Sequence, residues 1–159
     1  MKAVTIWQPY AGAVAAGLKS YETRSWPTRY RGPIAIHASV RPVKGDARRL
    51  AETYGLKAER FGEIVAYADL TDCLLMTPDL IAAQSRQELD FGDWRPGRYA
   101  WRLENIRLPG YPIKVVGRQG LWNFNEPPQL EIALCKMRHN REEKIFCNKK
   151  LTKLTKINY

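Results

Sequence analysis

Alternating hydrophobic and polar positions predict a series of short strands along this chain. The clearest alternation covers residues 99–106, and a longer segment at 63–75 carries apolar residues at every second position in its first half. Further strands are predicted at 3–7, 20–26, 33–38 and 112–116, the last of them continuing after Gly117 into 121–124.

Three helices are predicted between these strands from their start and stop residues. The first covers 9–16 and ends at Gly17, the second runs from 46 to 54 and ends at Gly55, and the third covers 77–87. Five or six short strands with two or three helices favour an α+β fold. In such a fold a small, strongly curved sheet or closed β-barrel carries the helices at its rim.

The composition suits one globular domain and argues against other classes. The chain has 159 residues, of which 45% are hydrophobic and 26% charged. It has no apolar run of membrane-spanning length, and its first residues do not form a signal-peptide pattern. Its three widely spaced cysteines indicate neither a disulfide framework nor a zinc site. We therefore expect a reducing, cytoplasmic location and no membrane contact.

The net charge of +10 is unevenly distributed. Residues 136–159 contain 8 basic and 2 acidic side chains, whereas residues 1–135 contain 18 basic and 14 acidic ones, which leaves only +4 there. We therefore predict a domain at 1–128 and a basic C-terminal extension at 129–159. The extension either grips nucleic acid through its phosphates or is a solvated segment without that role.

Residues 17–24 bring three charged side chains within reach of one another. Gly17 ends the first helix, and the following turn and strand carry Lys19, Glu22 and Arg24. Because side chains on a strand alternate between its faces, Glu22 and Arg24 share one face, and Lys19 at the turn can fold back towards them. Such a group can bind a phosphate or a base edge, or polarise a carbonyl. The alternative is a solvated strand with one surface ion pair.

The same segment resembles the signature of the ASCH domain family, G-x-K-x-x-E-x-R, which Gly17, Lys19, Glu22 and Arg24 match in full. Small phage- and bacterial-type members are also similar at 5–9, 30–33, 36–38, 97–105 and 117–123. The resemblance covers residues 2–124 and implies a PUA-like barrel. It also implies a cleft beside the signature strand that binds RNA or a nucleobase.

One branch of this family consists of amidohydrolases that remove the acyl group from N4-acetylcytidine, and it resembles the chain at Lys19 and Arg24. That branch has a threonine nucleophile where this chain has Glu22, and a carboxylate cannot simply replace an activated hydroxyl. The hydrolases also use a glutamate from a helix, for which Glu88 is the nearest candidate by order in the chain. Other members of the family are described as ribonucleases.

Aromatic residues flank the signature and are candidates for stacking on a base. Trp26 is the first choice for a stacking wall, and Trp7 lies on the other side of the signature. Trp101 and Trp122, in the middle of predicted strands, are expected in the core. Gln8 either reads a base edge or caps the helix that follows it.

Two further residues have both a functional and a structural interpretation. His37, near the end of a predicted strand, is either a proton carrier or a hydrogen-bonded core residue. Arg118 either lines the cleft or belongs to a tight turn that requires its neighbouring glycines. No cluster of potential ligands has the spacing of a metal site, so we expect neither a metal nor a cofactor.

Three functional hypotheses follow. In the first, the domain binds RNA or a modified nucleoside, with Lys19 and Arg24 as donors, Glu22 as acceptor and Trp26 as stacking wall. In the second, it is a metal-independent amidohydrolase in which Lys19 activates water or a hydroxyl and Glu22 acts as base. In the third, it is a ribonuclease in which Lys19, Arg24 and His37 stabilise the reacting phosphate.

Overall fold

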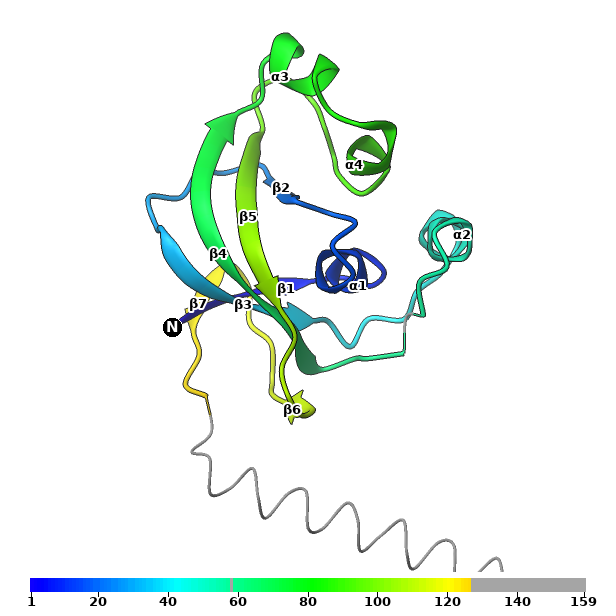
Figure 1. Ribbon diagram of the computed structural model, residues 1–159, viewed down its shortest axis with the longest axis vertical. Helices are drawn as coiled ribbons and strands as arrows, with labels where there is room; N and C mark the ends of the chain where they lie inside the picture. Colours follow the sequence, from blue (N-terminus) through cyan, green and yellow to red (C-terminus); the bar gives the residue numbers. More distant parts are fainter. Residues whose placement is uncertain (58, 127–159) are drawn as a thin grey trace, which may run out of the picture. The chain divides into compact units, whose positions relative to one another are not determined.

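One curled sheet organises the part of the chain that the computed structural model describes, residues 1–57 and 59–126 (Figure 1). Its strands follow the order β2-β5-β4-β3-β1-β7, with β6 paired to β4, and all neighbours are antiparallel except β1 and β3. The strands are β1 (Lys2–Ile6), β2 (Tyr21–Arg24), β3 (Gly32–Ala38), β4 (Glu63–Leu75), β5 (Tyr99–Arg107), β6 (Ile113–Lys114) and β7 (Leu121–Asn123).

The sheet curls into a half-barrel because its two longest strands are irregularly paired. The register of β4 against β5 shifts between Tyr67 and Asp69 and again between Leu70 and Asp72. An extra residue on one strand bends that strand and increases its twist. The result is the α+β, PUA-like architecture that the element pattern and the resemblance predict.

Two apolar clusters cover the two faces of the sheet. The larger one lies on the concave side, where α1 (Tyr10–Ala15) packs against β3, β4 and β5 through Ala11 and Val14 (Figure 1). The smaller one lies on the other face and includes Ala3, Ala35 and Trp122. Trp101 and Trp122 are both buried, as expected for core residues.

The described residues contain four short helices, where the sequence pattern predicted two or three. Besides α1 these are α2 (Asp46–Thr53), α3 (Pro78–Ala82) and α4 (Arg86–Asp90). The predicted helix at 77–87 is in fact two helices, because Ser85 adopts an extended conformation and caps a new one by accepting a hydrogen bond from Glu88 N. Thr77 caps α3 in the same way through Leu80 N.

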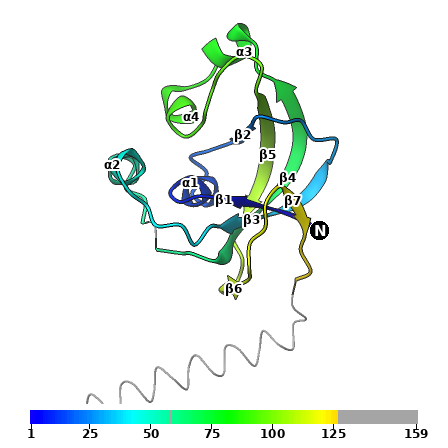
Figure 2. The same ribbon diagram turned by 180° about the vertical axis from the view of Figure 1, so that it is seen from behind.

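The last predicted strand also divides into two. β6 pairs with β4, whereas β7 pairs with β1 beside the N-terminus, as both views show (Figures 1 and 2). Gly117, which lies between them, packs directly against His37, and a Cβ there would overlap the imidazole ring. The chain bends further on, at Gln119 and Gly120, where Gly120 adopts a φ of +67°. The predicted basic extension at 129–159 lies outside the described residues, so its role and its boundary at 128 stay predictions.

Candidate functional site

The turn between α1 and β2 sets the direction of the signature strand. Gly17 adopts a φ of +71°, which favours glycine, and so reverses the chain at the end of the helix. The amides of Leu18 and Lys19 then both donate to Ala13 O, at 2.9 and 3.3 Å. Lys19 is therefore fixed at the base of the turn, directly before the strand that carries Glu22 and Arg24.

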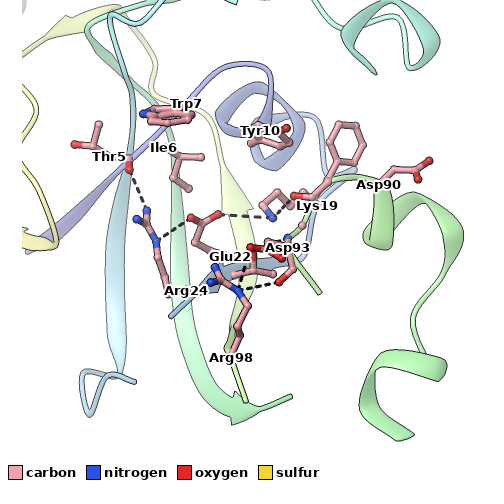
Figure 3. A pocket seen from close by; sticks show the side chains of 13 residues that line it. Thr5, Ile6, Trp7, Tyr10, Lys19, Glu22, Arg24, Asp90, Asp93 and Arg98 are labelled. Carbon is pink, nitrogen blue, oxygen red and sulfur yellow. Dashed lines mark hydrogen bonds and ion pairs between the residues drawn. The ribbon is translucent and has the colours of Figure 1, made fainter. Parts of the chain in front are cut away.

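Three signature side chains converge on one face, as the strand alternation predicts (Figure 3). Glu22 lies between two cations: its Oε2 is 3.6 Å from Lys19 Nζ, and its Oε1 is 3.0 Å from Arg24 Nε. Lys19 Nζ also donates to Phe91 O at 2.6 Å, and Arg24 Nη2 donates to Thr5 O at 3.0 Å. We call these three side chains the row Lys19–Glu22–Arg24. The two hydrogen bonds fix the row against β1 on one side and the loop after α4 on the other.

Burial distinguishes this row from a surface ion pair. Lys19 is only 1% exposed, and Glu22 is also buried, whereas Arg24 retains some contact with solvent. Burial lowers the pKa of Lys19, although the negative charges of Glu22 and Glu88 oppose that effect. The alternative of a solvated strand with one surface ion pair is therefore wrong for this segment.

A cavity of about 410 Å³ opens beside the row. Its charged lining is balanced, with three basic and three acidic side chains. That balance suits a ligand that presents both hydrogen-bond donors and acceptors. The lining residues are Thr5, Ile6, Trp7, Tyr10, Lys19, Glu22, Thr23, Arg24, Asp90, Phe91, Gly92, Asp93 and Arg98.

The loop after α4 forms a wall of the cavity beside the signature strand (Figure 3). Asp93 N donates to Thr23 Oγ1 at 3.0 Å, which ties this loop to β2. A hydrogen bond from Arg95 is the main cause that lowers the pKa of Asp93, and Arg98 Nε lies 3.4 Å from its carboxylate. The wall therefore presents a carboxylate that stays ionised, held by two arginines.

Glu88 binds the backbone between the signature turn and β2. Its two carboxylate oxygens accept from Ser20 N at 2.8 Å and Tyr21 N at 3.2 Å, and it is not among the residues that line the cavity. Trp94 Nε1 in turn donates to Glu88 O at 2.9 Å. This arrangement makes Glu88 a positioning residue for the turn that carries Lys19.

Trp7, Trp26 and Arg118 line a second cavity of about 950 Å³ that shares Thr5, Trp7 and Arg24 with the first. Trp7 is 52% exposed, and the guanidinium of Arg41 stacks on its ring at 3.8 Å. Trp26 meets the ring of Trp101 edge-on, with 4.6 Å between centroids.

Gln8 and His37 lie apart from the first cavity. Gln8 is buried and caps α1: its Oε1 accepts from Gly12 N at 2.9 Å, and its Nε2 donates to Arg60 O at 2.8 Å. Of its two interpretations, helix capping is therefore the one that the structure supports.

His37 faces the side of the sheet opposite the signature row, because its neighbours Ile36 and Ala38 belong to the concave core. Its Nε2 lies 3.0 Å from Val115 O, and its Nδ1 is buried without a hydrogen-bond partner in the described part of the chain. Burial lowers the pKa of His37. It lines neither cavity, so we interpret it as a core residue and not as a proton carrier for this site.

Sequence reasoning missed several residues of the site. Tyr10, Asp90, Phe91 and Arg98 line the cavity, and Phe91 contributes through its backbone carbonyl, which no sequence pattern reveals. The turn-rich segment 91–97 was a usable signal, because ligand-contacting residues concentrate on loops. Among the described residues, no group of three His, Cys, Asp or Glu side chains could hold a metal ion, and no helix is long and apolar enough to cross a membrane.

The curled sheet, the helix on its concave side and the buried cation–carboxylate–cation row together define a PUA-like domain with a polar cleft. The family model for the ASCH domain matches residues 4–107, so the chain belongs to the ASCH domain family, which is linked to RNA binding.

Solved structures agree with this fold. The crystal structures of two mutant proteins of ASCH from Zymomonas mobilis both give a TM-score of 0.50 at 18% identity. One match covers 83% of this chain and 95% of the other, and the second covers 84% and 94%. The crystal structure of ASCH from Zymomonas mobilis is 19% identical, with a TM-score of 0.48 over 79% of this chain and 87% of that one. No curated protein sequence matches this chain significantly.

Proposed function

We propose that this domain binds RNA or a modified nucleoside in the cavity lined by Lys19, Glu22 and Arg24. The observation that carries the proposal is the buried row itself, in which a carboxylate held between two cations faces a cavity of about 410 Å³. That volume falls within the range of small-molecule sites. Burying an ammonium group costs several kcal/mol, so its position beside a cavity favours a functional role over a structural one.

The chemistry of the lining suits a nucleobase. Carboxylates accept from the exocyclic amine of cytosine, and Glu22 is the buried carboxylate on the signature strand. Arg24, which keeps some solvent contact, has further N–H groups for a base carbonyl or a phosphate. Trp7 and Tyr10 bring aromatic rings to the same cavity. An inorganic anion would not need the three carboxylates of the lining.

A second candidate function is the hydrolysis of N4-acetylcytidine to acetate and cytidine. The observation in its favour is that burial lowers the pKa of Lys19, which makes a neutral amine more accessible as a base. In that reaction Lys19 would take a proton from water as the oxygen attacks the acetyl carbonyl. The proton would then pass to the departing amine of cytidine. Thr23 carries the only aliphatic hydroxyl of the signature strand, and its Oγ1 already accepts a hydrogen bond from Asp93 N. In this scheme water, and not Thr23, is therefore the nucleophile.

One experiment separates these functions. The full chain is incubated with N4-acetylcytidine, and separately with labelled single-stranded RNA, alongside the Lys19→Ala and Glu22→Ala variants. Arg102→Gln is the matched control, because Arg102 is exposed and lies between two core residues of β5, so it faces away from the row.

For the binding function we expect RNA retention that Lys19→Ala and added salt weaken, with both probes left intact. Deacetylation that both variants abolish would replace binding with the hydrolase function, and shortened RNA would indicate the ribonuclease. If neither variant differs from Arg102→Gln with either probe, the assignment of this cavity is wrong.

A further inference from the structure

The second cavity differs from the first in its charge. Its lining contains Arg24, Lys114 and Arg118 and no acidic residue, whereas the first cavity has equal numbers of each sign. Lys114 pairs at 2.8 Å with Glu63, which also pairs with Arg60, whereas Arg118 forms no ion pair with the described residues and is exposed. A surface of this kind attracts an anionic group rather than a neutral base.

The same cavity is also lined by exposed apolar side chains. Val40 and Val116 are 74% and 83% exposed, and both line it beside the rings of Trp7 and Trp26. Arg41 stacks on Trp7 at the edge of this surface and adds another cation. Sites for single-stranded nucleic acid typically combine aromatic side chains with nearby cations, because the bases stack on the rings while the phosphates pair with arginine.

The two cavities are joined along one segment of the chain. Glu22 and Arg24 share one face of β2, and Trp26 follows two residues after the strand ends. Glu22 lines the first cavity, Trp26 the second, and Arg24 both. Because Arg24 lines both cavities, a ligand that occupies both of them passes its guanidinium.

We propose that the second cavity holds the nucleotide next to the base in the first cavity, so that the domain recognises single-stranded RNA rather than a free nucleoside. This inference rests on the proposed function of the first cavity. In the proposed complex, the base in the second cavity stacks on Trp26 or Trp7. The phosphate that links the two nucleotides lies at Arg24 and Arg118. The charge of Arg118, which no carboxylate in the described part of the chain offsets, then has a ligand.

The test compares two probes on the full chain. The first is cytidine, and the second is a fluorescein-labelled oligocytidylate of about eight nucleotides, a length within the range that one OB-fold, a single-strand-binding domain of another class, covers. The variants are Arg118→Gln and Trp26→Ala, with Trp26→Phe to retain a ring and Arg102→Gln as the matched charge control. Because Trp26 packs on Trp101, the thermal midpoint of each variant is measured first. Arg118 is exposed, so its variant tests the proposal even if Trp26→Ala does not fold.

We expect Trp26→Ala to weaken oligocytidylate binding about tenfold or more, and Trp26→Phe to restore most of it. Arg118→Gln should lower the slope of log affinity against log salt by about 0.7, and Arg102→Gln should leave it unchanged. In both cavity variants the loss should be larger for oligocytidylate than for cytidine.

Three outcomes would overturn this proposal. In the first, Arg118→Gln behaves like Arg102→Gln. In the second, both probes lose affinity equally. In the third, polyglutamate competes as well as RNA, which would indicate a general polyanion surface. A different result would refute the base site proposed for the first cavity, and keep only the second cavity as a surface that binds RNA: Glu22→Gln and Lys19→Ala leave both probes unaffected while Arg118→Gln still weakens the oligocytidylate.

Discussion

Replacing Lys19 by methionine tests whether the buried row exists for binding or for stability. Taking the ammonium out of water costs several kcal/mol, and Glu22 at 3.6 Å and Phe91 O at 2.6 Å repay part of that cost. Lys19→Met removes the cost but leaves the Phe91 carbonyl without its donor, a loss of about 1–3 kcal/mol. Because these effects oppose each other, we expect the free energy of unfolding to change by less than about 2 kcal/mol in either direction.

Glu22→Gln should be more damaging than Lys19→Met. It leaves an ammonium that is 1% exposed without its nearest counter-charge, and it also removes the partner of Arg24. Breaking a buried pair from one side costs about 3–5 kcal/mol. The double variant, Lys19→Met with Glu22→Gln, should recover part of this loss because no ammonium is then left buried.

Urea unfolding followed by tryptophan fluorescence measures all three variants, with the m-value as a check on two-state behaviour. The pH dependence gives a second readout. The folded protein releases the Lys19 proton below 10.5, where the unfolded chain still holds it. Between the two pKa values the wild type should therefore gain stability relative to Lys19→Met as pH rises. If Lys19→Met costs as much as Glu22→Gln, Lys19 is a structural residue and our reasoning is refuted.

Three further predictions concern the frame of the site. Gly117→Ala should destabilise by about 1–3 kcal/mol, since its Cβ would overlap His37, whereas the matched Gly110→Ala meets open space and should be neutral; equal thermal midpoints would contradict this. Glu88→Ala should cost about 2–4 kcal/mol in urea unfolding, because it leaves two backbone amides unpaired; a cost below about 1 kcal/mol would count against it. Stability should fall as pH drops below 6.5, where the unfolded chain binds a proton that folded His37 resists; His37→Gln should flatten that fall, and an unchanged profile would exclude His37 as its cause.

The sequence pattern predicted the strands well where local alternation and burial agree. The long strand at 63–75 has the predicted bounds, and β5 ends one residue beyond its prediction. The same alternation predicted that Glu22 and Arg24 would share a face, because that depends only on the period of a strand.

Other features depend on partners far along the chain and could not be predicted locally. Phe91 O meets Lys19 across 72 positions, and the division between β6 and β7 is decided by pairing with β4 and β1. His37 and Gln8 each have a polar side chain that suits a site or a core hydrogen bond. Two facts of the folded structure decide between a site residue and a core residue. One is the face of the sheet on which the side chain lies, and the other is the backbone carbonyl or amide that it contacts.

Ultraviolet crosslinking of single-stranded RNA to the full chain, followed by mass spectrometry of the modified peptides, tests the proposed RNA binding most directly. We predict crosslinks at the aromatic residues that line the joined cavities, foremost Trp7, Tyr10 and Trp26, and their loss in Glu22→Gln. Crosslinks confined to residues 129–159, or unaffected by Glu22→Gln, would contradict the proposed function.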